Sequence, residues 1–461
     1  MSGKRQKIQR KQLHLAFGSE GRGESPDAEH EGTEPPAAKR GPESPAGTES
    51  WMEAVCDREN LWKALKRVQA NKGSAGVDGM TVQQLPGCLA KRWPAIREQL
   101  LQGTYRPQPV KRVEIPKPDG GVRKLGIPTV LDRFIQQAVL RVLQGQWDRT
   151  FSEHSYGFRP GRSAHQAVAA AQQYIADGCR WVVDIDLEKF FDRVNHDRLM
   201  AAVATRVQDK RLLKLIRAFL NAGVMARGLV SPTDEGAPQG GPLSPLLSNL
   251  VLDELDRELE KRGHRFVRYA DDCNIYVRSE RAGQRVMASI ERFIIRKLKL
   301  KVNAAKSAVA RPRERTFLGF TFTANREPKR RIAGKALARF TRKVRELTRR
   351  RRGISVETMG RQLATYLRGW RGYFGFCQSP SVLGNLDSWI RRRLRCFQWK
   401  QWKRGRRRFA ELRRLGVGKE LAAQTAGSCH GPWRISRSPA LSYAMPGAFW
   451  DELGLPRLQA R

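Results

Sequence analysis

The sequence contains no run of eighteen apolar residues, so no segment is predicted to cross a membrane. Its seven cysteines are odd in number and include no Cys-x-x-Cys pair, which argues against a disulfide framework and against a zinc module. Acidic residues are scarce, since 45 Asp and Glu stand against 87 Lys and Arg. A net charge of +42 on a chain that is 40% hydrophobic predicts a folded protein whose partner is a polyanion.

Residues 1–50 have little with which to build a core. Phe17 is their one aromatic residue, and Gly, Pro, Glu and Ser are frequent, so we expect a disordered tail. The first residues also lack the apolar stretch of a signal peptide, which indicates a cytoplasmic protein. Order is expected from Trp51 onward, and the length of 461 residues allows two or three domains.

The acidic pair Asp271-Asp272 is the most informative feature of the chain. The residues on both sides, from Arg265 to Val277, are largely apolar and roughly alternate, which predicts two short strands joined by a bend at the pair. Adjacent carboxylates between apolar strands repel each other unless a cation binds them. A divalent cation is therefore expected, although a solvated turn is the simpler alternative for a lone Asp-Asp pair.

A third carboxylate, Asp186, ends the alternating segment Arg180–Asp186, which is predicted to be a strand. If this strand pairs with those around the acidic bend, three carboxylates converge. Three carboxylates that hold two Mg²⁺ ions about 3.5–4 Å apart are what in-line nucleotidyl transfer requires. The sequence thus predicts a two-metal site made of Asp186, Asp271 and Asp272.

A β-hairpin is predicted over residues 113–128, where an Asp-Gly-Gly turn separates two strands. One arm carries Lys117 and the other carries Arg123. These cations suit a triphosphate, and the alternative is ordinary surface charge. The segment Leu131 to Trp147 then shows the apolar stripe of a helix that packs on a core.

Two further turns are candidates for contact with nucleic acid. Residues 155–163 combine arginines with aromatic side chains, which suits a template backbone and its bases. The turn at residues 236–245 is rich in Gly and Pro and has one polar side chain at its centre, Gln239, so it is either a binding turn or a structural one. The glycine-rich segment 71–79 lacks the P-loop pattern and is predicted to be a surface loop.

In their order along the chain, these features resemble a reverse transcriptase, and in detail the reverse transcriptase/maturase encoded by bacterial group II introns. Seven blocks in the family's order carry the resemblance, which makes it specific. The blocks are Ile115-Pro-Lys-Pro-Asp-Gly120, Tyr156-Gly-Phe-Arg-Pro-Gly-Arg162, Asp186-Leu-Glu-Lys-Phe-Phe-Asp192, Pro238-Gln-Gly-Gly-Pro-Leu-Ser-Pro245, Tyr269-Ala-Asp-Asp272, Leu300-Lys-Val-Asn-Ala-Ala-Lys306 and Phe317-Leu-Gly-Phe320.

The resemblance implies an RNA-directed DNA polymerase, with a role for each matching position. Asp186, Asp271 and Asp272 would bind two Mg²⁺ ions, helped by the backbone carbonyl of Leu187. Phe191 matches the ring that excludes a ribose 2′ hydroxyl and so selects dNTPs over rNTPs. The remaining implied roles are triphosphate binding for Lys117 and Arg123, the nucleotide pocket for Gln239, protonation of pyrophosphate for Lys306, and the primer grip for Phe317, Leu318, Gly319 and Phe320.

A basic and aromatic region near the C-terminus resembles the thumb or maturase domain of the same family. The stretch Arg391–Arg414 holds 12 Lys or Arg residues against one acidic residue, with two tryptophans among them. Such a surface suits structured RNA, and a merely solvated helix face is the alternative. The apolar stripe of the preceding helix, at residues 363–374, is predicted to be core. The predicted RNA-binding residues are Arg159, Arg162, Arg391, Arg392, Arg393, Arg395, Trp399, Lys400, Trp402, Lys403 and Arg404.

The predicted fold is α+β, a right-hand polymerase with fingers and an antiparallel palm sheet, followed by an all-α thumb/maturase domain. No nuclease with paired cysteines is visible near the C-terminus. The expected divisions are a disordered tail at 1–50, an N-terminal extension at 51–95, fingers and palm at 96–325, a thumb/maturase domain at 335–415 and a short basic tail at 416–461.

The expected function is RNA-directed DNA synthesis with two Mg²⁺ ions, together with binding of a group II intron RNA to assist its splicing and retrotransposition. The expected partners are that intron RNA, an RNA template with a DNA primer, dNTPs and a DNA target, in a bacterial cytoplasm near the nucleoid and with no membrane. Two alternatives stay open. One is a splicing factor with a vestigial polymerase, which predicts decayed metal ligands, and the other is a reverse transcriptase co-opted for phage defence.

Overall fold

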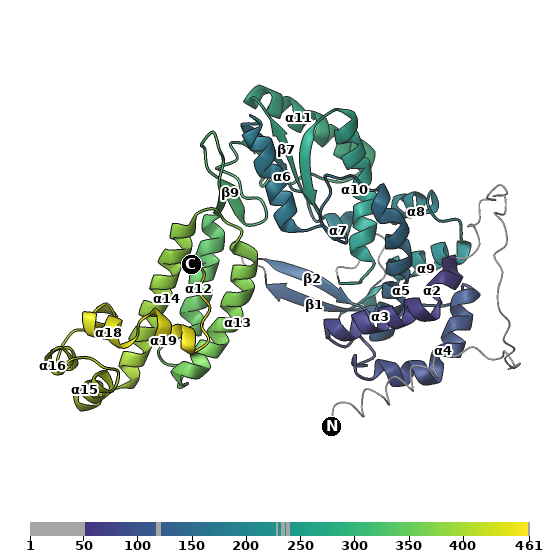
Figure 1. Cartoon of the computed structure of the whole chain (residues 1–461). Coiled ribbons are helices and arrows are strands. Elements are labelled where there is room, and N and C mark those ends of the chain that lie inside the picture. Colours follow the sequence, from purple (N-terminus) through teal and green to yellow (C-terminus); the bar gives the residue numbers. More distant parts are fainter. Residues whose placement is uncertain (1–50, 117–120, 227–228, 232–235, 237–239, 460–461) are drawn as a thin grey trace, which may run out of the picture. The chain divides into compact units, whose positions relative to one another are not determined.

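A computed structural model shows how the chain folds, and its elements are drawn in Figure 1. The predicted tail, Lys117 and Gln239 lie outside the described residues. The described residues are 51–459 except for 117–120, 227–228, 232–235 and 237–239.

Among the described residues the strands form three sheets, with the orders β2-β1-β4-β5, β6-β7-β3-β8 and β10-β9. Strands β1 (Val110–Pro116) and β2 (Val122–Ile127) run antiparallel with Pro116 opposite Val122, which confirms the predicted hairpin. The other strands are β3 (Trp181–Ile185), β4 (Val224–Ala226), β5 (Leu229–Ser231), β6 (Arg265–Tyr269), β7 (Asp272–Val277), β8 (Ala308–Ala310), β9 (Phe320–Phe322) and β10 (Arg330–Ile332).

The chain divides into two compact units, and each unit is built from separated segments. The predicted divisions, in contrast, are continuous stretches, because composition shows only where the character of a chain changes along its length. Unit 1 comprises Met1–Ser163, Ile185–Cys273 and Arg285–Ala308, and unit 2 comprises Ala164–Asp184, Asn274–Gln284 and Val309–Arg461.

Some helices in the first part of the chain begin at polar side chains that cap them, among them α3 and α5. The carboxylate of Asp57 accepts from the backbone N–H of Glu59 and Asn60, and the hydroxyl of Thr129 accepts from that of Asp132. The apolar stripe predicted after the hairpin is buried as expected, in α5. These helices are α2 (Trp51–Val55), α3 (Arg58–Asn71), α4 (Leu85–Leu101), α5 (Val130–Trp147), η1 (Asp148–Thr150), α6 (Ala164–Ala176), α7 (Phe190–Arg193), α8 (His196–Ala204), α9 (Lys210–Leu220), α10 (Ser244–Lys261), α11 (Glu280–Phe293) and η2 (Ile294–Leu298).

The C-terminal part of unit 2 is helical around one hydrophobic core. The rings of Phe340 and Trp370, from its first two helices, lie 4.2 Å apart between centroids. The stretch predicted as a short tail is folded, because Leu441 and Trp450 are buried in the same core. The helices are α12 (Gly334–Leu347), α13 (Val356–Phe374), α14 (Pro380–Gln401), α15 (Gly405–Arg414), α16 (Lys419–Ala426), α17 (Pro432–Ile435), α18 (Pro439–Ala444) and α19 (Gly447–Glu452).

The tryptophans of the basic region are also part of this core. Trp399 is 1% exposed and Trp402 is 2% exposed, and their rings meet at 6.0 Å between centroids. A buried ring has no free face for a nucleic-acid base. The prediction that these two tryptophans stack on RNA is therefore wrong, and their role is packing.

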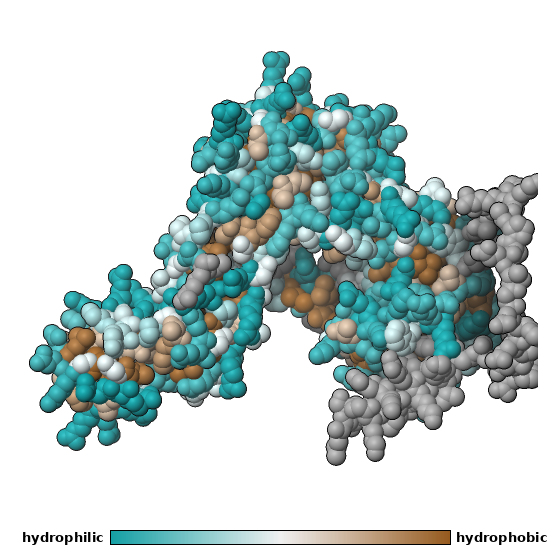
Figure 2. All heavy atoms as spheres, viewed as in Figure 1, coloured by the Kyte–Doolittle hydropathy of each residue, from teal (hydrophilic) through white to brown (hydrophobic). Residues whose placement is uncertain are grey.

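The surface agrees with the composition of the chain. Figure 2 shows hydrophilic residues over most of the visible face. In the part of the chain that the structure describes, no helix is both long enough and apolar enough to cross a bilayer. All seven cysteines are free thiols, as the sequence predicts.

Candidate active site

The acidic pair lies at a tight bend, as predicted. Strand β6 ends just before Ala270, which is buried and takes a left-handed φ of 57°, and β7 begins two residues later. That conformation is unfavourable for alanine, so the surrounding structure must hold it. A Cβ added to Gly157 would lie 2.2 Å from the backbone nitrogen of Ala270, so glycine is required where this turn meets the bend.

Asp186 follows the last residue of β3 and is held by main-chain and side-chain contacts. Its backbone N–H donates to Oγ of Ser307 at 3.0 Å, and its carbonyl accepts from the N–H of Asn303 at 2.8 Å. The next residue, Leu187, continues this pairing in an antiparallel bridge. The Nζ of Lys306 lies 3.3 Å from a carboxylate oxygen of Asp186, so two residues of the predicted site are neighbours.

The carboxylate of Asp271 is surrounded by charges of both signs. Burial raises the pKa of Asp271 above its ordinary value, and the negative charge of Asp186 adds to the rise. The positive charges of Arg123 and Lys306 act on this pKa in the opposite direction. Four groups that the sequence assigns to one site therefore lie within electrostatic reach of one another.

The donor set fits a hard divalent cation. Carboxylate oxygens are the ligands that Mg²⁺ prefers. The negative charges of Asp186 and Asp271 repel each other, and a bound cation would neutralise them. Among the described residues, no three His, Cys, Asp or Glu side chains form a closed metal cluster. Like-charged carboxylates are expected to stay apart when no cation bridges them.

The glycine-rich turn approaches both the hairpin and Phe191. A Cβ on Gly240 would lie 2.6 Å from the carbonyl oxygen of Gly126 in β2, and one on Gly236 would lie 2.9 Å from the carbonyl oxygen of Phe191. Both glycines also have positive φ values, of 135° and 92°, so glycine is required at each. Arg123 is exposed on the same strand β2. Three segments predicted to contact a nucleotide are therefore packed together.

The two arginines predicted to bind RNA in the 155–163 turn differ in exposure. Arg159 is buried, and its guanidinium donates to a carboxylate oxygen of Asp148 at 2.9 Å and to the carbonyl of Ser152 at 2.6 Å. It fixes the turn, and the prediction that it contacts RNA is wrong. Arg162 lies over the ring of Tyr156, with Cζ 5.6 Å from the ring centroid, and stays a candidate.

The predicted primer grip is a turn in unit 2. Leu318 and Gly319 have positive φ values of 50° and 82°, and the rings of Phe317 and Phe320 on either side are buried. The hydroxyl of Tyr373 donates to the carbonyl of Leu318 at 2.7 Å. The rings thus anchor the turn, and the partly exposed Leu318 and Gly319 are the residues that can contact a primer.

The predicted RNA-binding cations on α14 and after it are of two kinds. Lys400, Lys403 and Arg404 are exposed. Arg393 and Arg395 are half-buried, and burial lowers the pKa of both, with further lowering by neighbouring arginines. Cations that repel each other in a partly buried setting are stabilised when an anion binds.

A polar cluster beside the acidic bend was missed in the sequence. Arg268 and Asp256 form an ion pair in which both side chains are fully buried. The signal was an arginine directly after Phe266 and Val267 in strand β6, which needs a partner when the strand is covered. Its partners come from a helix and a turn far away in sequence, and these could not be identified without the fold.

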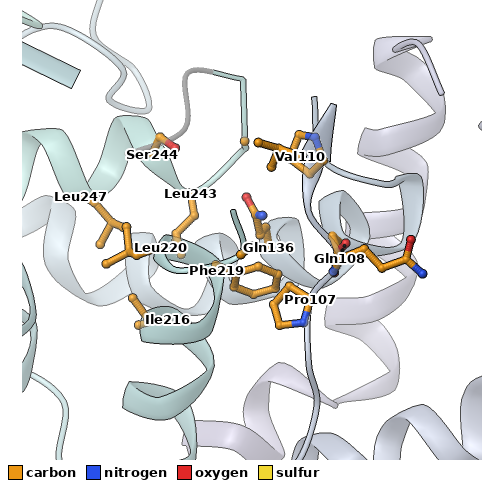
Figure 3. Close-up of a pocket in the computed structure, with 14 residues that line it drawn as sticks. Pro107, Gln108, Val110, Gln136, Ile216, Phe219, Leu220, Leu243, Ser244 and Leu247 are labelled. Carbon is orange, nitrogen blue, oxygen red and sulfur yellow. Dashed lines mark hydrogen bonds between the residues drawn. The ribbon is translucent and has the colours of Figure 1, made fainter. Parts of the chain in front are cut away.

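A narrow pocket in unit 1 is lined by other residues (Figure 3). Its wall includes apolar side chains from α9 and α10, among them Phe219 and Leu247. Asp132 is buried beside it and accepts hydrogen bonds from the hydroxyls of Thr129 at 2.6 Å and Tyr105 at 2.9 Å. This carboxylate is satisfied within the chain, and among the described residues no predicted site residue lines the pocket. We therefore do not assign the active site to this pocket.

Two protein families match the chain. Residues 115–322 match the family described as reverse transcriptase (RNA-dependent DNA polymerase), and residues 337–416 match the group II intron, maturase-specific domain. The chain joins a reverse transcriptase domain to a group II intron maturase-specific domain. A reverse transcriptase domain implies the right-hand polymerase fold and a divalent metal, typically Mg²⁺. The predicted fold class is thereby confirmed.

Relatives of the reverse transcriptase domain cover part of the chain. Protein YkfC of Escherichia coli (strain K12) is 40% identical over 218 residues, which are 46% of this chain and 57% of that protein. Group II intron-encoded protein LtrA of Lactococcus lactis subsp. cremoris is 37% identical over 195 residues, which are 42% of this chain and 32% of that protein. A putative COX1/OXI3 intron 2 protein of Saccharomyces cerevisiae is 30% identical over 214 residues, 46% of this chain and 25% of that protein. The chain therefore spans less than two thirds of the length of these relatives.

Proposed function

We propose that the chain is an RNA-directed DNA polymerase that also binds a group II intron RNA and assists its splicing and retrotransposition. The observation that carries the polymerase is the placement of Asp186, whose carboxylate lies 3.3 Å from Nζ of Lys306 and is close enough to Asp271 for its charge to add to the rise that burial causes in the pKa of that carboxyl. Nucleotidyl transfer requires carboxylates that hold divalent cations beside cationic side chains that hold phosphates. The match of residues 115–322 to the reverse transcriptase family supports the same reaction.

Asp186, Asp271 and Asp272 would hold two Mg²⁺ ions, together with the backbone carbonyl of Leu187. When bound, such ions lower the pKa of a primer 3′ hydroxyl and neutralise the charge that develops on the leaving pyrophosphate. Arg123, exposed on β2, would bind the triphosphate and hold it in line with the primer end. The chain's main contribution is therefore alignment of charged groups before reaction.

Other side chains would set selectivity and proton transfer. The ring of Phe191 would exclude a ribose 2′ hydroxyl, and Lys306 would give a proton to the leaving pyrophosphate. The turn at residues 317–320 would hold the primer end. Lys117 and Gln239 are proposed for the triphosphate and the nucleotide pocket.

The maturase-specific part would bind the intron RNA. The exposed side chains of Lys400, Lys403 and Arg404 support this proposal, because phosphate neutralisation by such cations gives RNA affinity. The half-buried Arg393 and Arg395 would gain a counter-charge from the same phosphates. An RNA template with a DNA primer, dNTPs and a DNA target complete the proposed partners, in a bacterial cytoplasm near the nucleoid.

Primer extension by Asp271→Asn tests the polymerase. Purified chain with Mg²⁺, an RNA template, a DNA primer and dNTPs should extend the primer, and Asp271→Asn should abolish extension, because one metal ligand loses its charge. RNA affinity should stay within about twofold, since the surface cations are unchanged. Asp197→Asn is a matched control, because Asp197 is an exposed carboxylate of the same unit in an ion pair with Arg217. Absence of extension by the unmodified chain would refute the polymerase.

The RNA that co-purifies with the chain tests the maturase part. Sequencing of that RNA should recover one folded intron, because a maturase binds its own RNA in preference to others. A splicing factor with a vestigial polymerase would give the same RNA without primer extension. A random RNA population would leave the polymerase and remove the maturase.

A further inference from the structure

Arg268, near the end of β6, has a hydrogen-bond acceptor for each of its five guanidinium N–H donors. Nε donates to one carboxylate oxygen of Asp256 at 2.7 Å, and Nη2 donates to the other. Nη1 donates to Oδ1 of Asn249 at 3.1 Å and to the backbone carbonyl of Ala270 at 2.9 Å. Nη2 also donates to Oγ of Ser155 at 2.8 Å. The guanidinium thus joins helix α10, the turn at Ser155 and the acidic bend.

This arrangement is not explained by stability alone. Arg268 and Asp256 are fully buried, and removing two charges from water is a cost that well-packed hydrophobic residues would avoid. A buried ion pair is best accounted for where it fixes a particular arrangement of segments. The arrangement fixed here includes the carbonyl of Ala270, the residue directly before the two aspartates.

Asn249 connects the same network to the other side of the bend. Its Nδ2 donates to the carbonyl of Gly157 at 2.8 Å, and Gly157 is the residue that lies against the backbone of Ala270. The main chain of Arg268 adds a contact, since its N–H donates to the carbonyl of His154 at 2.9 Å. The bend is therefore held by side chains from one direction and by the turn from another.

We propose that Arg268 and Asn249 are positioning residues for the metal-binding bend, which act through the carbonyl of Ala270 and through Gly157. They hold the left-handed conformation of Ala270, and so they fix the direction in which the two following aspartates leave the strand. Loss of either contact allows the backbone of the bend to change conformation, and the two carboxylates then bind a cation with lower affinity. This inference rests on the proposed polymerase and adds to it the residues that set metal affinity.

The test compares Asn249→Ala with Ser248→Ala in the full chain. Ser248 is the adjacent buried residue of α10, and its hydroxyl donates to the carbonyl of Ser244 within the same helix, so Ser248→Ala removes one buried hydrogen bond outside the network, whereas Asn249→Ala removes two within it. Binding of Mn²⁺ alone is measured by electron paramagnetic resonance, and the Mg²⁺ half-saturation of primer extension is measured in parallel. In Asn249→Ala we expect the affinity for Mn²⁺ to fall roughly tenfold or more and the half-saturating Mg²⁺ concentration to rise by a similar factor, as for residues that orient metal ligands. In Ser248→Ala both quantities should be unchanged. Arg268→Lys, which keeps the charge and loses the fork, should change both quantities as Asn249→Ala does.

Thermal melting separates positioning from folding. Asn249→Ala should melt at a lower temperature than Ser248→Ala, because it leaves a donor of the buried Arg268 and the carbonyl of Gly157 without this partner. Metal binding is therefore compared well below both melting temperatures, where a difference between the two folded variants assigns the effect to the bend. An Asn249→Ala protein that binds Mn²⁺ within about twofold of Ser248→Ala would overturn the inference. If Asn249→Ala does not fold, Ser155→Ala, which removes one hydroxyl contact to Arg268, decides by the same criterion. An unmodified chain that neither binds Mn²⁺ nor extends a primer would count against the polymerase instead.

Discussion

Phe191 is the side chain that would set sugar selection in the proposed nucleotide pocket. Its ring meets that of Phe190 edge to face, with centroids 5.3 Å apart, and its carbonyl lies against Gly236, so the position of the ring is fixed. Phe191→Ala would remove the surface that a 2′ hydroxyl meets. We expect the ratio of kcat/KM for dNTPs to that for rNTPs to fall roughly a hundredfold, the scale for one hydroxyl in a shaped pocket.

Single-nucleotide primer extension with matched dNTP and rNTP measures this ratio. Phe340→Leu is the control, because Phe340 is 1% exposed and its ring packs on Trp370 in the core of unit 2, whereas Phe191 belongs to unit 1. That variant should lower the melting temperature and leave the ratio unchanged. A ratio that did not move in Phe191→Ala would remove Phe191 from the nucleotide pocket.

The thiols of Cys56 and Cys429 should differ widely in reactivity. Burial raises the pKa of Cys56 to about 11, whereas Cys429 is exposed. The thiolate is the reactive form, and at pH 8 only about one Cys56 in a thousand is ionised. Iodoacetamide at pH 8 should therefore modify Cys429 long before Cys56, and the rate at Cys56 should rise with pH up to about 11. Peptide mass spectrometry measures both rates, and unfolded chain, in which the two thiols should react alike, is the control.

Helix α14 carries packing residues and phosphate-binding candidates side by side. Trp399 is buried and its neighbour Lys400 is exposed, so substitution of the first should lower stability and substitution of the second should lower RNA affinity. Trp399→Ala should destabilise the folded chain by about 3–5 kcal/mol, the usual cost of a large ring removed from a core. Lys400→Ala should change stability by less than about 0.5 kcal/mol and weaken RNA binding.

Denaturant unfolding and filter binding separate the two effects. The RNA affinity of Trp399→Ala is measured at a temperature where that variant stays folded, and it should then match the unmodified chain. Weakened RNA binding by folded Trp399→Ala, with normal stability, would restore the tryptophan to the RNA surface.

The elements that the sequence predicts well are those in which burial repeats with a regular period. The strands around Asp271-Asp272 and the stripe of α5 are examples, because alternation and helical spacing follow directly from which face is covered. Trp399 was assigned wrongly, because the many cations around it mask the buried face of α14. Periodicity identifies a buried side chain only when the apolar residues of its own helix or strand recur at regular spacing.

The contacts that hold the site could not be predicted, because they join segments far apart in the chain. Arg268 meets Asp256 across 12 positions and Ser155 across 113. Each partner, seen alone, is an ordinary polar residue of a helix or a turn. Sequence order gave the three aspartates through the motifs around them, and the structure supplied the residues that orient them.

The net charge of +42 belongs to the chain as a whole, and hydrophilic residues cover most of the face that Figure 2 shows. A charge of this size attracts any polyanion. Its contribution to binding affinity falls as the salt concentration rises, because the counterions that binding releases then gain less free energy. Total charge therefore cannot distinguish a specific RNA surface from general attraction. The dependence of affinity on salt can, because its slope counts the phosphates that are actually contacted.

Neutralising Lys400, Lys403 and Arg404 together should reduce that slope. Each phosphate contact contributes about 0.7 in a single strand and about 0.9 in a duplex to the slope of log affinity against log salt, so the triple Gln variant should lower its magnitude by about 2 to 3. Titrations of intron RNA from low to moderate salt measure it. A matched control makes the same charge change at three arginines that are already in ion pairs with acidic residues, namely Arg198, Arg257 and Arg262. These arginines have their counter-charge within the chain, so the control slope should stay close to that of the unmodified protein. Equal slopes for the two triple variants would mean that the RNA responds to total charge, and that the surface after α14 makes no phosphate contacts of its own.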